Sequence, residues 1–451
     1  MFRFKNSLYK YVILFWLLNI RLAFTRTSEL LCVVQFSRHG ARTSNTFQSK
    51  TFNKVFGEQL ILTPNGFRQH ELLGKFIKDK YTNDIPFLIN NNIHSRVEII
   101  STPVQRTINS AMAFINGFYP GAIVKMNYQN SSHLHGVINN DTIPIENAFN
   151  LQYEEIPITI LSTVNDFFHR GKCLYRGDKL QKRVEYENKG ISLYDEIHNN
   201  LNITELSIEL AKFLNVDPPE DMDDVDNGNY LTEMEKYLQT FLYHYGKNLD
   251  DPMLSRDFAK IIKMQMINKK YSFRVRDSKY LRILTSEIFQ MILNKFEASI
   301  YDEQERKLFV YFTHDSTFMN LFGNLIVNDK LKEYTLKAIN DKDYYDFIMP
   351  PYASTILFEL YRRNNGYFVI INYNGKLIEK DLKYIDNNKI TNGEIQYNNF
   401  QFMLTQLIEK DYRKLLCDGT YIDETYIHSL DYTPSIKKKD YTRHFLKKPK
   451  K

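Results

Sequence analysis

The fold of this 451-residue chain is indicated by Leu30-Leu-Cys-Val-Val-Gln-Phe36, which runs directly into Ser37-Arg-His-Gly-Ala-Arg42. A short apolar run that stops at a serine and a glycine is typical of a strand buried on both faces. Such strands lie in parallel sheets that are covered by helices on both sides. We therefore predict an α/β protein in which the polar residues 37–42 follow the carboxyl end of a central strand.

The same order of strand, loop and helix recurs along the chain. The apolar run 97–100 ends at Ser101-Thr-Pro103 and precedes a predicted helix over 105–118. The run 308–312 leads into Thr313-His-Asp315 in the same way. This repetition predicts a three-layer α/β/α sandwich around a largely parallel sheet.

Further elements are expected on both sides of these strands. Helices are predicted over 65–81, 280–298 and 399–416, and two strands at 354–361 and 367–373 flank the hairpin signal Asn364-Asn-Gly366. The apolar face of the first helix is expected to consist of Phe67, Leu72, Leu73, Phe76 and Ile77. Residues 145–275 differ in texture and are predicted to form a helical cap inserted between core segments 26–144 and 276–417.

The net charge of +6 comes from the two ends of the chain. Residues 437–451 carry +7 and residues 1–25 carry +4, so removing both from the total leaves the body at −5. Nucleic-acid binding needs cationic side chains gathered on a folded face. We therefore expect no nucleic-acid partner, and we interpret residues 418–451 as a basic C-terminal tail.

The N-terminal 25 residues have the layout of a secretory signal peptide. Basic residues precede the apolar run 11–18, which is too short to span a bilayer, and small or polar residues follow it. Three glycosylation sequons, at Asn130, Asn140 and Asn202, agree with a secretory route. These features predict a protein of the lysosomal lumen or the secreted space without a stable membrane span, although retention of the leader as an anchor stays open.

The three cysteines allow at most one internal disulfide. Cys32 lies within the first apolar strand, so we expect a buried thiol. Cys173 and Cys417 lie in polar, loop-like surroundings and are the candidates for pairing.

Chemistry-bearing side chains follow three of the predicted strands. They are Arg38, His39 and Arg42 after the first strand, Arg106 after the second, and His314 with Asp315 after the third. Ligands of open α/β sheets bind outside the carboxyl ends of the strands, where these loops should meet. Three guanidinium groups would bind the oxygens of a phosphate, a neutral imidazole could attack its phosphorus, and a carboxyl could protonate the leaving oxygen.

These segments resemble the histidine acid phosphatases, also called clade-2 histidine phosphatases, and among them the lysosomal and prostatic type. The resemblance runs from about Leu30 to Cys417. The segments that carry it are Phe36-Ser-Arg-His-Gly-Ala-Arg-Thr43, Leu62-Thr-Pro-Asn-Gly66, Ser101-Thr-Pro-Val-Gln-Arg-Thr107, Thr313-His-Asp-Ser-Thr317 and Pro350-Pro-Tyr-Ala-Ser354.

The resemblance implies a phosphoglycerate-mutase-like fold with a cap, and a phosphatase that acts on small phosphate monoesters without metal or other cofactor. It implies that His39 is the nucleophile and Asp315 the proton donor. It assigns the phosphate pocket to Arg38, Arg42, Arg106 and His314. It also implies a disulfide between Cys173 and Cys417. The motif departs from the family at Ser44, where a proline is usual.

Alternatives remain at this point. A phytase or another selective phosphatase could use the same scaffold, as could a phosphoryl-transferring mutase or a non-catalytic protein that binds phosphate esters. The complete set of nucleophile, cations and acid favours an enzyme. The oligomeric state stays open, with a homodimer among the alternatives. We predict no metal at His133-Leu-His135 or in the acidic loop 217–226, and a structural role for His70.

Overall fold

The computed structural model describes residues 28–42, 61–88, 93–128, 155–161, 279–302, 306–338, 341–363 and 366–412. The leader, most of the predicted cap, the basic tail, Cys173, Cys417 and the three sequons lie outside these ranges. The predictions on them therefore stay predictions.

A mixed ten-stranded sheet forms the centre of the described structure, in the order β3-β4-β2-β5-β1-β6-β7-β10-β9, with β8 paired to β7. The strands are β1 (Glu29–Arg38), β2 (Val97–Ser101), β3 (Ile123–Tyr128), β4 (Glu155–Ile160), β5 (Leu308–Thr313), β6 (Thr355–Arg363), β7 (Gly366–Tyr373), β8 (Lys376–Leu377), β9 (Ile390–Thr391) and β10 (Glu394–Gln396). Pairing is parallel from β3 to β1 and antiparallel from β6 onward. The parallel expectation thus holds for one half of the sheet.

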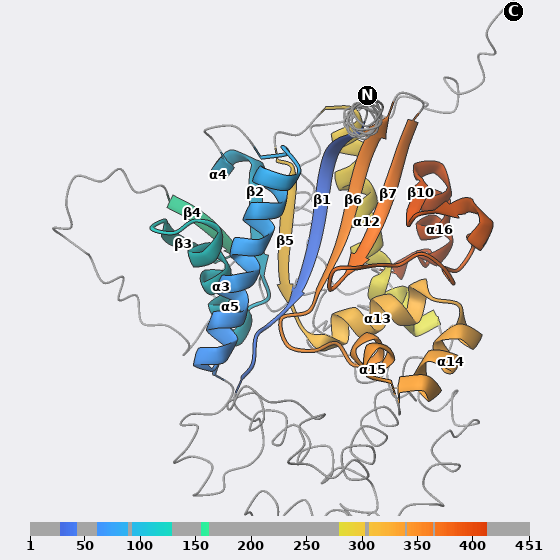
Figure 1. Ribbon diagram of the computed structural model, residues 1–451, viewed down its shortest axis with the longest axis horizontal. Helices are drawn as coiled ribbons and strands as arrows, with labels where there is room; N and C mark the ends of the chain where they lie inside the picture. Colours follow the sequence, from blue (N-terminus) through green and yellow to red (C-terminus); the bar gives the residue numbers. More distant parts are fainter. Residues whose placement is uncertain are drawn as a thin grey trace, which may run out of the picture.

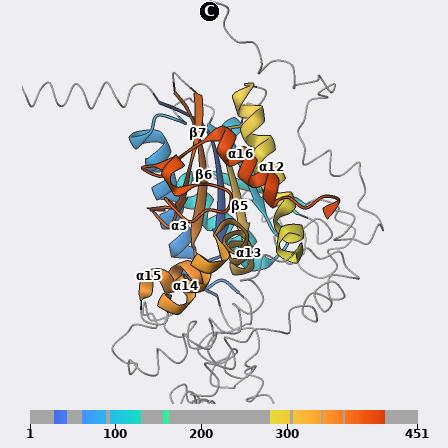
Figure 2. The ribbon, with the colours of Figure 1, turned by 90° about the vertical axis from the view of Figure 1, so that its right-hand side faces the viewer.

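Helices cover both faces of this sheet (Figures 1 and 2). They are α3 (Pro64–Asp79) with a π-helical turn at Lys80–Asp84, α4 (Ile93–Arg96), α5 (Gln105–Phe118), α12 (Lys279–Ile300), α13 (Asp315–Leu325), α14 (Asn328–Ala338), α15 (Lys342–Ile348), a 3-10 turn at Asn387–Lys389, and α16 (Tyr397–Leu407). None of the helices within the described ranges is long and apolar enough to cross a membrane.

Strand β5 shows how the sequence specifies three layers. All six of its residues are buried. Phe309 and Tyr311 pack into the core that contains α12, α13 and α16, whereas Val310 and Phe312 pack into the core that contains α3 and α5. Alternate side chains of a strand point to opposite faces. A strand that is buried at every position therefore requires helices on both sides, which confirms the three-layer prediction.

Two boundaries differ from the sequence prediction. Residues 155–160 form β4, a parallel strand between β3 and β2, so the predicted start of the cap at residue 145 is wrong. Pro157 lies within this continuous strand and conceals it in the sequence, because proline cannot donate to a strand ladder and argues against a central strand. The last helix ends at Leu407, short of the predicted residue 416, and the chain continues extended at Ile408.

The buried face of α3 also differs from the prediction. Phe67, Leu72 and Phe76 are 41%, 49% and 56% exposed, whereas the helix buries Gly66, His70, Gly74 and Ile77. Gly74 lies where α5 passes very close, whereas Gly66 lies against Ala41 of the loop after β1. A Cβ on Gly74 would lie 2.0 Å from the carbonyl oxygen of Phe114.

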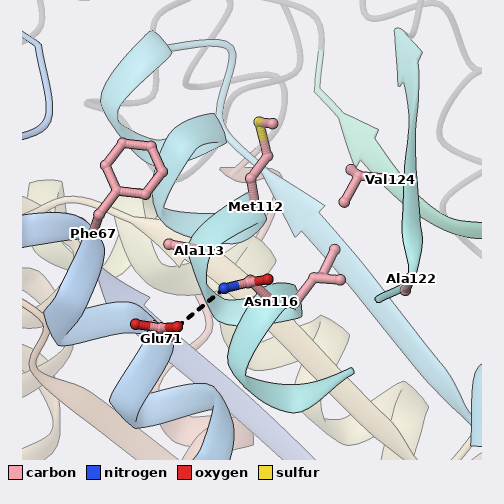
Figure 3. Close-up of a pocket in the computed structure, with 8 residues that line it drawn as sticks. Phe67, Glu71, Met112, Ala113, Asn116, Ala122 and Val124 are labelled. Atoms are coloured by element: carbon pink, nitrogen blue, oxygen red, sulfur yellow. Dashed lines mark hydrogen bonds between the residues drawn. The ribbon is translucent and has the colours of Figure 1, made fainter. Parts of the chain in front are cut away.

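A surface pocket lies between α3, α5 and β3. Phe67 and Met112 line this pocket, and Asn116 of α5 donates to Glu71 of α3 across 3.1 Å (Figure 3).

Cys32 is fully buried in β1, as predicted, and burial raises the pKa of its thiol to about 12. A thiol that stays protonated in this way is unreactive at neutral pH.

Candidate active site

Three neighbouring parallel strands end side by side at one edge of the sheet. Ser101 of β2 pairs with Phe312 of β5, and Phe312 lies in register with Ser37 of β1. The loops after these strands therefore begin at the same level, close to α13 and α15 (Figure 1). This arrangement brings together the side chains that the sequence predicted to meet.

His39 lies at the centre of these loops and is 3% exposed. Its Nδ1 lies 2.9 Å from the carbonyl oxygen of Gly40. A carbonyl only accepts hydrogen bonds, so Nδ1 carries the proton and Nε2 keeps its lone pair. The ring thus presents an unprotonated nitrogen.

Surroundings of His39 favour the neutral ring. Burial lowers its pKa well below 6.5, and the positive charges of Arg106 and Arg38 lower it further, together with His314 and Arg42. Both effects destabilise an imidazolium. Burial and the neighbouring cations therefore both favour the neutral ring of His39, whose unprotonated nitrogen can act as a nucleophile.

The backbone of the loop 38–41 is completely paired. Every N–H and C=O of these four residues has a hydrogen-bond partner, which is what a buried, fixed loop requires. The partners are Ser354 O and His70 Nε2 for Arg38, Thr313 O and Ala353 N for His39, Ser110 Oγ and His39 Nδ1 for Gly40, and Gln69 Oε1 with Thr63 N and Oγ1 for Ala41. The loop is therefore held by the end of β5, by the residues just before β6, by Thr63 at the start of α3, and by the helices α3 and α5.

Gly40 is required by the close approach of α3. A Cβ at this position would lie 2.5 Å from the carbonyl oxygen of Gly66. Any larger residue would push the His39 loop away from the helix that holds it.

Arg38 is held from three sides. Its Nη1 donates to the carbonyl oxygen of Pro350, and its guanidinium carbon lies 4.2 Å above the ring of Tyr352. Its Nη2 lies 3.9 Å from Oδ2 of Asp315. This group is therefore an oriented cation next to the carboxyl.

Arg106, at the start of α5, is the second oriented cation. Burial and the neighbouring Arg42 lower its pKa to about 10, which leaves it charged at any pH below neutrality. Among the described residues, the buried Nε atoms of Arg38 and Arg106 have no hydrogen-bond partner. Buried donors of this kind suit an anionic ligand, which would satisfy them.

His314 precedes α13 and has both ring nitrogens engaged. Arg106 Nη2 lies 3.2 Å from its Nδ1, and Thr102 Oγ1 lies 3.0 Å from its Nε2. Arginine can only donate, so Nδ1 accepts and Nε2 carries the proton. His314 therefore has the opposite tautomer to His39, with ring centroids 5.6 Å apart. In this geometry it orients Arg106.

Asp315 begins α13, with a side chain that is 27% exposed. Its Oδ1 accepts a hydrogen bond from the backbone N–H of Ser316 at 2.8 Å. The carboxyl thus lies at the edge of the site, next to Arg38 and within reach of solvent, where it can exchange a proton.

Sequence reasoning assigned no role to several residues that hold this site. Tyr352, Thr102, Ser110 and Gln69 contact the predicted site residues or their loop. Their position in the sequence could have identified them: Thr102 and Tyr352 lie within segments that carry the family resemblance, and Ser110 and Gln69 lie three residues after such segments. His70, buried with Nε2 donating to Arg38 O, has the structural contact expected of it.

The model of the histidine phosphatase superfamily (branch 2) matches residues 44–374. The chain belongs to this superfamily. The matched residues begin two positions after Arg42 and so do not include the loop with His39. The evidence that this loop belongs to the site is the geometry described above. The resemblance noted in the sequence is thereby confirmed at the level of the family.

Curated relatives of this histidine phosphatase cover most of its length. Rat (Rattus norvegicus) "Prostatic acid phosphatase" is 23% identical over 363 residues, which is 79% of this chain and 81% of the relative. Human (Homo sapiens) "Lysosomal acid phosphatase" is 22% identical and covers 77% of this chain and 71% of the relative.

Solved structures share its fold at lower identity. A phytase of Hafnia alvei superposes with a TM-score of 0.54 at 14% identity, covering 86% of this chain and 98% of that chain. The multiple inositol polyphosphate phosphatase of Bifidobacterium longum gives a TM-score of 0.52 at 11% identity, covering 89% and 94%. These likenesses confirm the α/β histidine phosphatase fold.

Proposed function

We propose that this histidine phosphatase is an acid phosphatase that hydrolyses phosphate monoesters through a phosphohistidine intermediate. One observation carries the proposal: His39 has its Nδ1 proton fixed on Gly40 O, and its pKa is held well below 6.5. A phosphatase that works in acid needs a nucleophile that is not protonated there. The acid phosphatases among the curated relatives support the same activity.

In the first step, Nε2 of His39 attacks phosphorus while the bond from phosphorus to the ester oxygen breaks. Asp315, in its protonated form, gives its proton to the departing oxygen. Charge on the phosphoryl oxygens is stabilised by the guanidinium groups of Arg38, Arg42 and Arg106. The products of this step are the free alcohol and phosphohistidine.

In the second step, a water attacks the same phosphorus. The Asp315 carboxylate takes a proton from this water, and the bond between phosphorus and Nε2 breaks. His39 is released neutral and inorganic phosphate leaves. Asp315 is then protonated again and ready for the next ester.

The alternatives receive less support. Solved phytases show the fold alone, at 14% identity for the Hafnia alvei enzyme, so they do not favour a phytase. A protein that only binds phosphate esters has no need of a carboxyl placed beside the cations, as Asp315 is beside Arg38.

We further propose that the protein acts in a lysosomal or secreted space. The signal-peptide layout of residues 1–25 and the sequons support this. A nucleophile that stays neutral in acid also suits an acidic compartment. Amino-terminal sequencing of the secreted protein, and loss of mass on glycosidase treatment at Asn130, Asn140 and Asn202, are the direct tests.

The experiment that tests the activity is an assay of the purified protein on a panel of phosphate monoesters from about pH 4 to pH 8. The His39→Ala variant should lose turnover entirely. An alkaline quench should trap labelled phosphate on the wild-type protein and not on the variant. A wild-type protein that hydrolyses esters without becoming labelled would contradict the phosphohistidine step.

A further inference from the structure

We propose that Gln69 is a positioning residue for the His39 nucleophile, acting through the peptide unit between Gly40 and Ala41. The inference rests on the proposed function, because it explains how the nucleophile is kept in one tautomer. Gln69 lies on α3 and contacts the backbone N–H of Ala41. It acts on the imidazole only through this peptide unit.

Two hydrogen bonds meet on this single peptide unit. Gln69 Oε1 accepts from the N–H of Ala41 at 2.9 Å, and the C=O of Gly40 accepts from His39 Nδ1 at 2.9 Å. A peptide unit is planar, so its N–H and C=O turn together. Holding the N–H on Gln69 therefore aims the carbonyl at the imidazole.

The hold matters because of Gly40. Glycine has the widest range of backbone conformations, so the peptide that follows it rotates easily unless something fixes it. Glycine is nevertheless required here, since a Cβ would collide with Gly66. Close packing therefore requires a glycine at position 40, and the hydrogen bond from Ala41 N–H to Gln69 restricts the peptide rotation that this glycine would allow.

Polarisation adds to the geometry. An amide that donates through its N–H becomes a better acceptor at its carbonyl, because hydrogen bonds in a chain strengthen one another. The chain here runs from Gln69 through the peptide to His39. It favours the tautomer with the proton on Nδ1, which leaves Nε2 for attack on phosphorus.

Stability of α3 does not depend on this contact. The helix has its own N-terminal cap, with Thr63 Oγ1 accepting from Gly66 N at 3.1 Å, and its buried face contains Gly74 and Ile77. Gln69 is half-buried at the rim of that face. Its removal should therefore leave the fold intact and disturb the orientation of the peptide.

The test uses Gln69→Leu, which removes the acceptor at similar size, and Gln69→Glu, which keeps an Oε acceptor. Gln290→Leu is the matched control, because Gln290 is also a half-buried helical glutamine, hydrogen-bonded only to Asn294 among the described contacts. The measurements are the single-turnover rate of phosphohistidine formation, the inhibition constant of inorganic phosphate, and the nuclear magnetic resonance signal of the His39 Nδ1 proton.

We expect Gln69→Leu to slow phosphohistidine formation by about 10-fold to 100-fold, by analogy with the loss caused by removing a residue that orients a metal-bound histidine. Its inhibition constant for phosphate should stay within about twofold, because the arginines are untouched. The Nδ1 proton signal should shift or broaden. Gln69→Glu should restore most of the rate, and Gln290→Leu should match the wild type.

A Gln69→Leu variant with the wild-type rate and an unchanged Nδ1 signal would overturn the proposal. So would equal losses in rate and in phosphate affinity, which would indicate collapse of the whole loop. If the wild-type protein forms no phosphohistidine at all, the proposed function fails instead, and the Nδ1 signal still decides whether Gln69 positions His39.

Discussion

Arg106 donates through Nη2 to Nδ1 of His314 across 3.2 Å, and this contact links the loop after β2 to the loop after β5. His314 is itself fixed by Thr102, at the end of β2. The arginine is therefore held close to His39, where, after burial itself, its charge lowers the pKa of the imidazole more than any other charge does. In the proposed mechanism, the position of this one cation would therefore affect both the binding of phosphate and the protonation of His39.

Replacing this charge should move the acidic limb of the pH profile. In Arg106→Gln the pKa of His39 rises toward 6.5, because a positive charge that disfavours the imidazolium is gone. His39 then becomes protonated at higher pH as acid is added. The acidic limb of kcat/KM, measured against pH, should therefore shift upward.

The matched variant Arg106→Lys keeps the charge and loses the planar fork. It should leave the acidic limb in place while KM rises, because lysine cannot bind two phosphate oxygens in the bidentate manner. Arg68→Gln, at an exposed residue of α3, is the surface control. An unmoved limb in Arg106→Gln would show that Arg106 does not contribute to the lowered pKa of His39.

Asp315 should matter most for poor leaving groups. The Asp315→Asn variant cannot supply the proton to a departing alkoxide, whereas nitrophenolate leaves without one. We expect the first step to fall by about 10²-fold to 10⁴-fold for alkyl phosphates and far less for nitrophenyl phosphate. The measurement is the single-turnover rate on both esters. Equal losses on the two would remove Asp315 from the role of acid.

The convergence of these side chains could be predicted from the sequence because they follow short strands that are mostly apolar. Once 30–36 and 308–312 are recognised as neighbouring buried strands, His39 and His314 must emerge at the same edge. Their residue types then indicate the reaction. Arg106 required one further step, since it lies a few residues beyond the end of β2.

The supporting residues could not be predicted in the same way, because their roles arise from packing. Three bulky residues of α3 that the pattern predicted to be buried, Phe67, Leu72 and Phe76, are exposed. Only Ile77 of the predicted face is fully buried, and the buried face also contains Gly66 and Gly74. A glycine contact is determined by how closely two backbones approach, and no periodicity of apolar residues reports that distance. His70 lies on this buried face and Gln69 lies at its rim, so neither could be assigned a contact from the sequence pattern.

His70 should make the stability of the protein depend on pH. Burial lowers its pKa to about 3, so the folded protein keeps it neutral while the unfolded chain takes up a proton below 6.5. Its contribution is therefore present above 6.5 and lost as the pH falls. Between pH 7 and pH 5 this single group costs about 2 kcal/mol of unfolding free energy.

The His70→Gln variant keeps an N–H donor for Arg38 O and does not titrate. Urea unfolding at the two pH values should show a smaller loss for the variant than for the wild type, by about 2 kcal/mol. Because the comparison is a difference of differences, the other titrating groups cancel. Equal losses in both proteins would mean that His70 is protonated in the folded state.

The crossing of α3 and α5 should tolerate no side chain at Gly117. A Cβ there would lie 1.8 Å from the carbonyl oxygen of Glu71 and 3.0 Å from the backbone nitrogen of Lys75. Both neighbours are backbone atoms, so no rotamer change relieves the clash and the helices must separate. We expect Gly117→Ala to destabilise the protein by about 1–3 kcal/mol, even though alanine is the better helix former.

Activity should fall together with stability in this variant, because α3 carries Gln69 and His70 while α5 carries Arg106 and Ser110. Asn116→Ala, at the preceding residue, is the matched control. Asn116 is exposed and its replacement removes only the contact with Glu71, so the loss of unfolding free energy should stay within about 0.5 kcal/mol. Thermal and urea unfolding measure both. A Gly117→Ala protein as stable as the wild type would mean that α3 and α5 lie farther apart than described. The side chains of these two helices that hold the His39 loop would then lie farther apart as well.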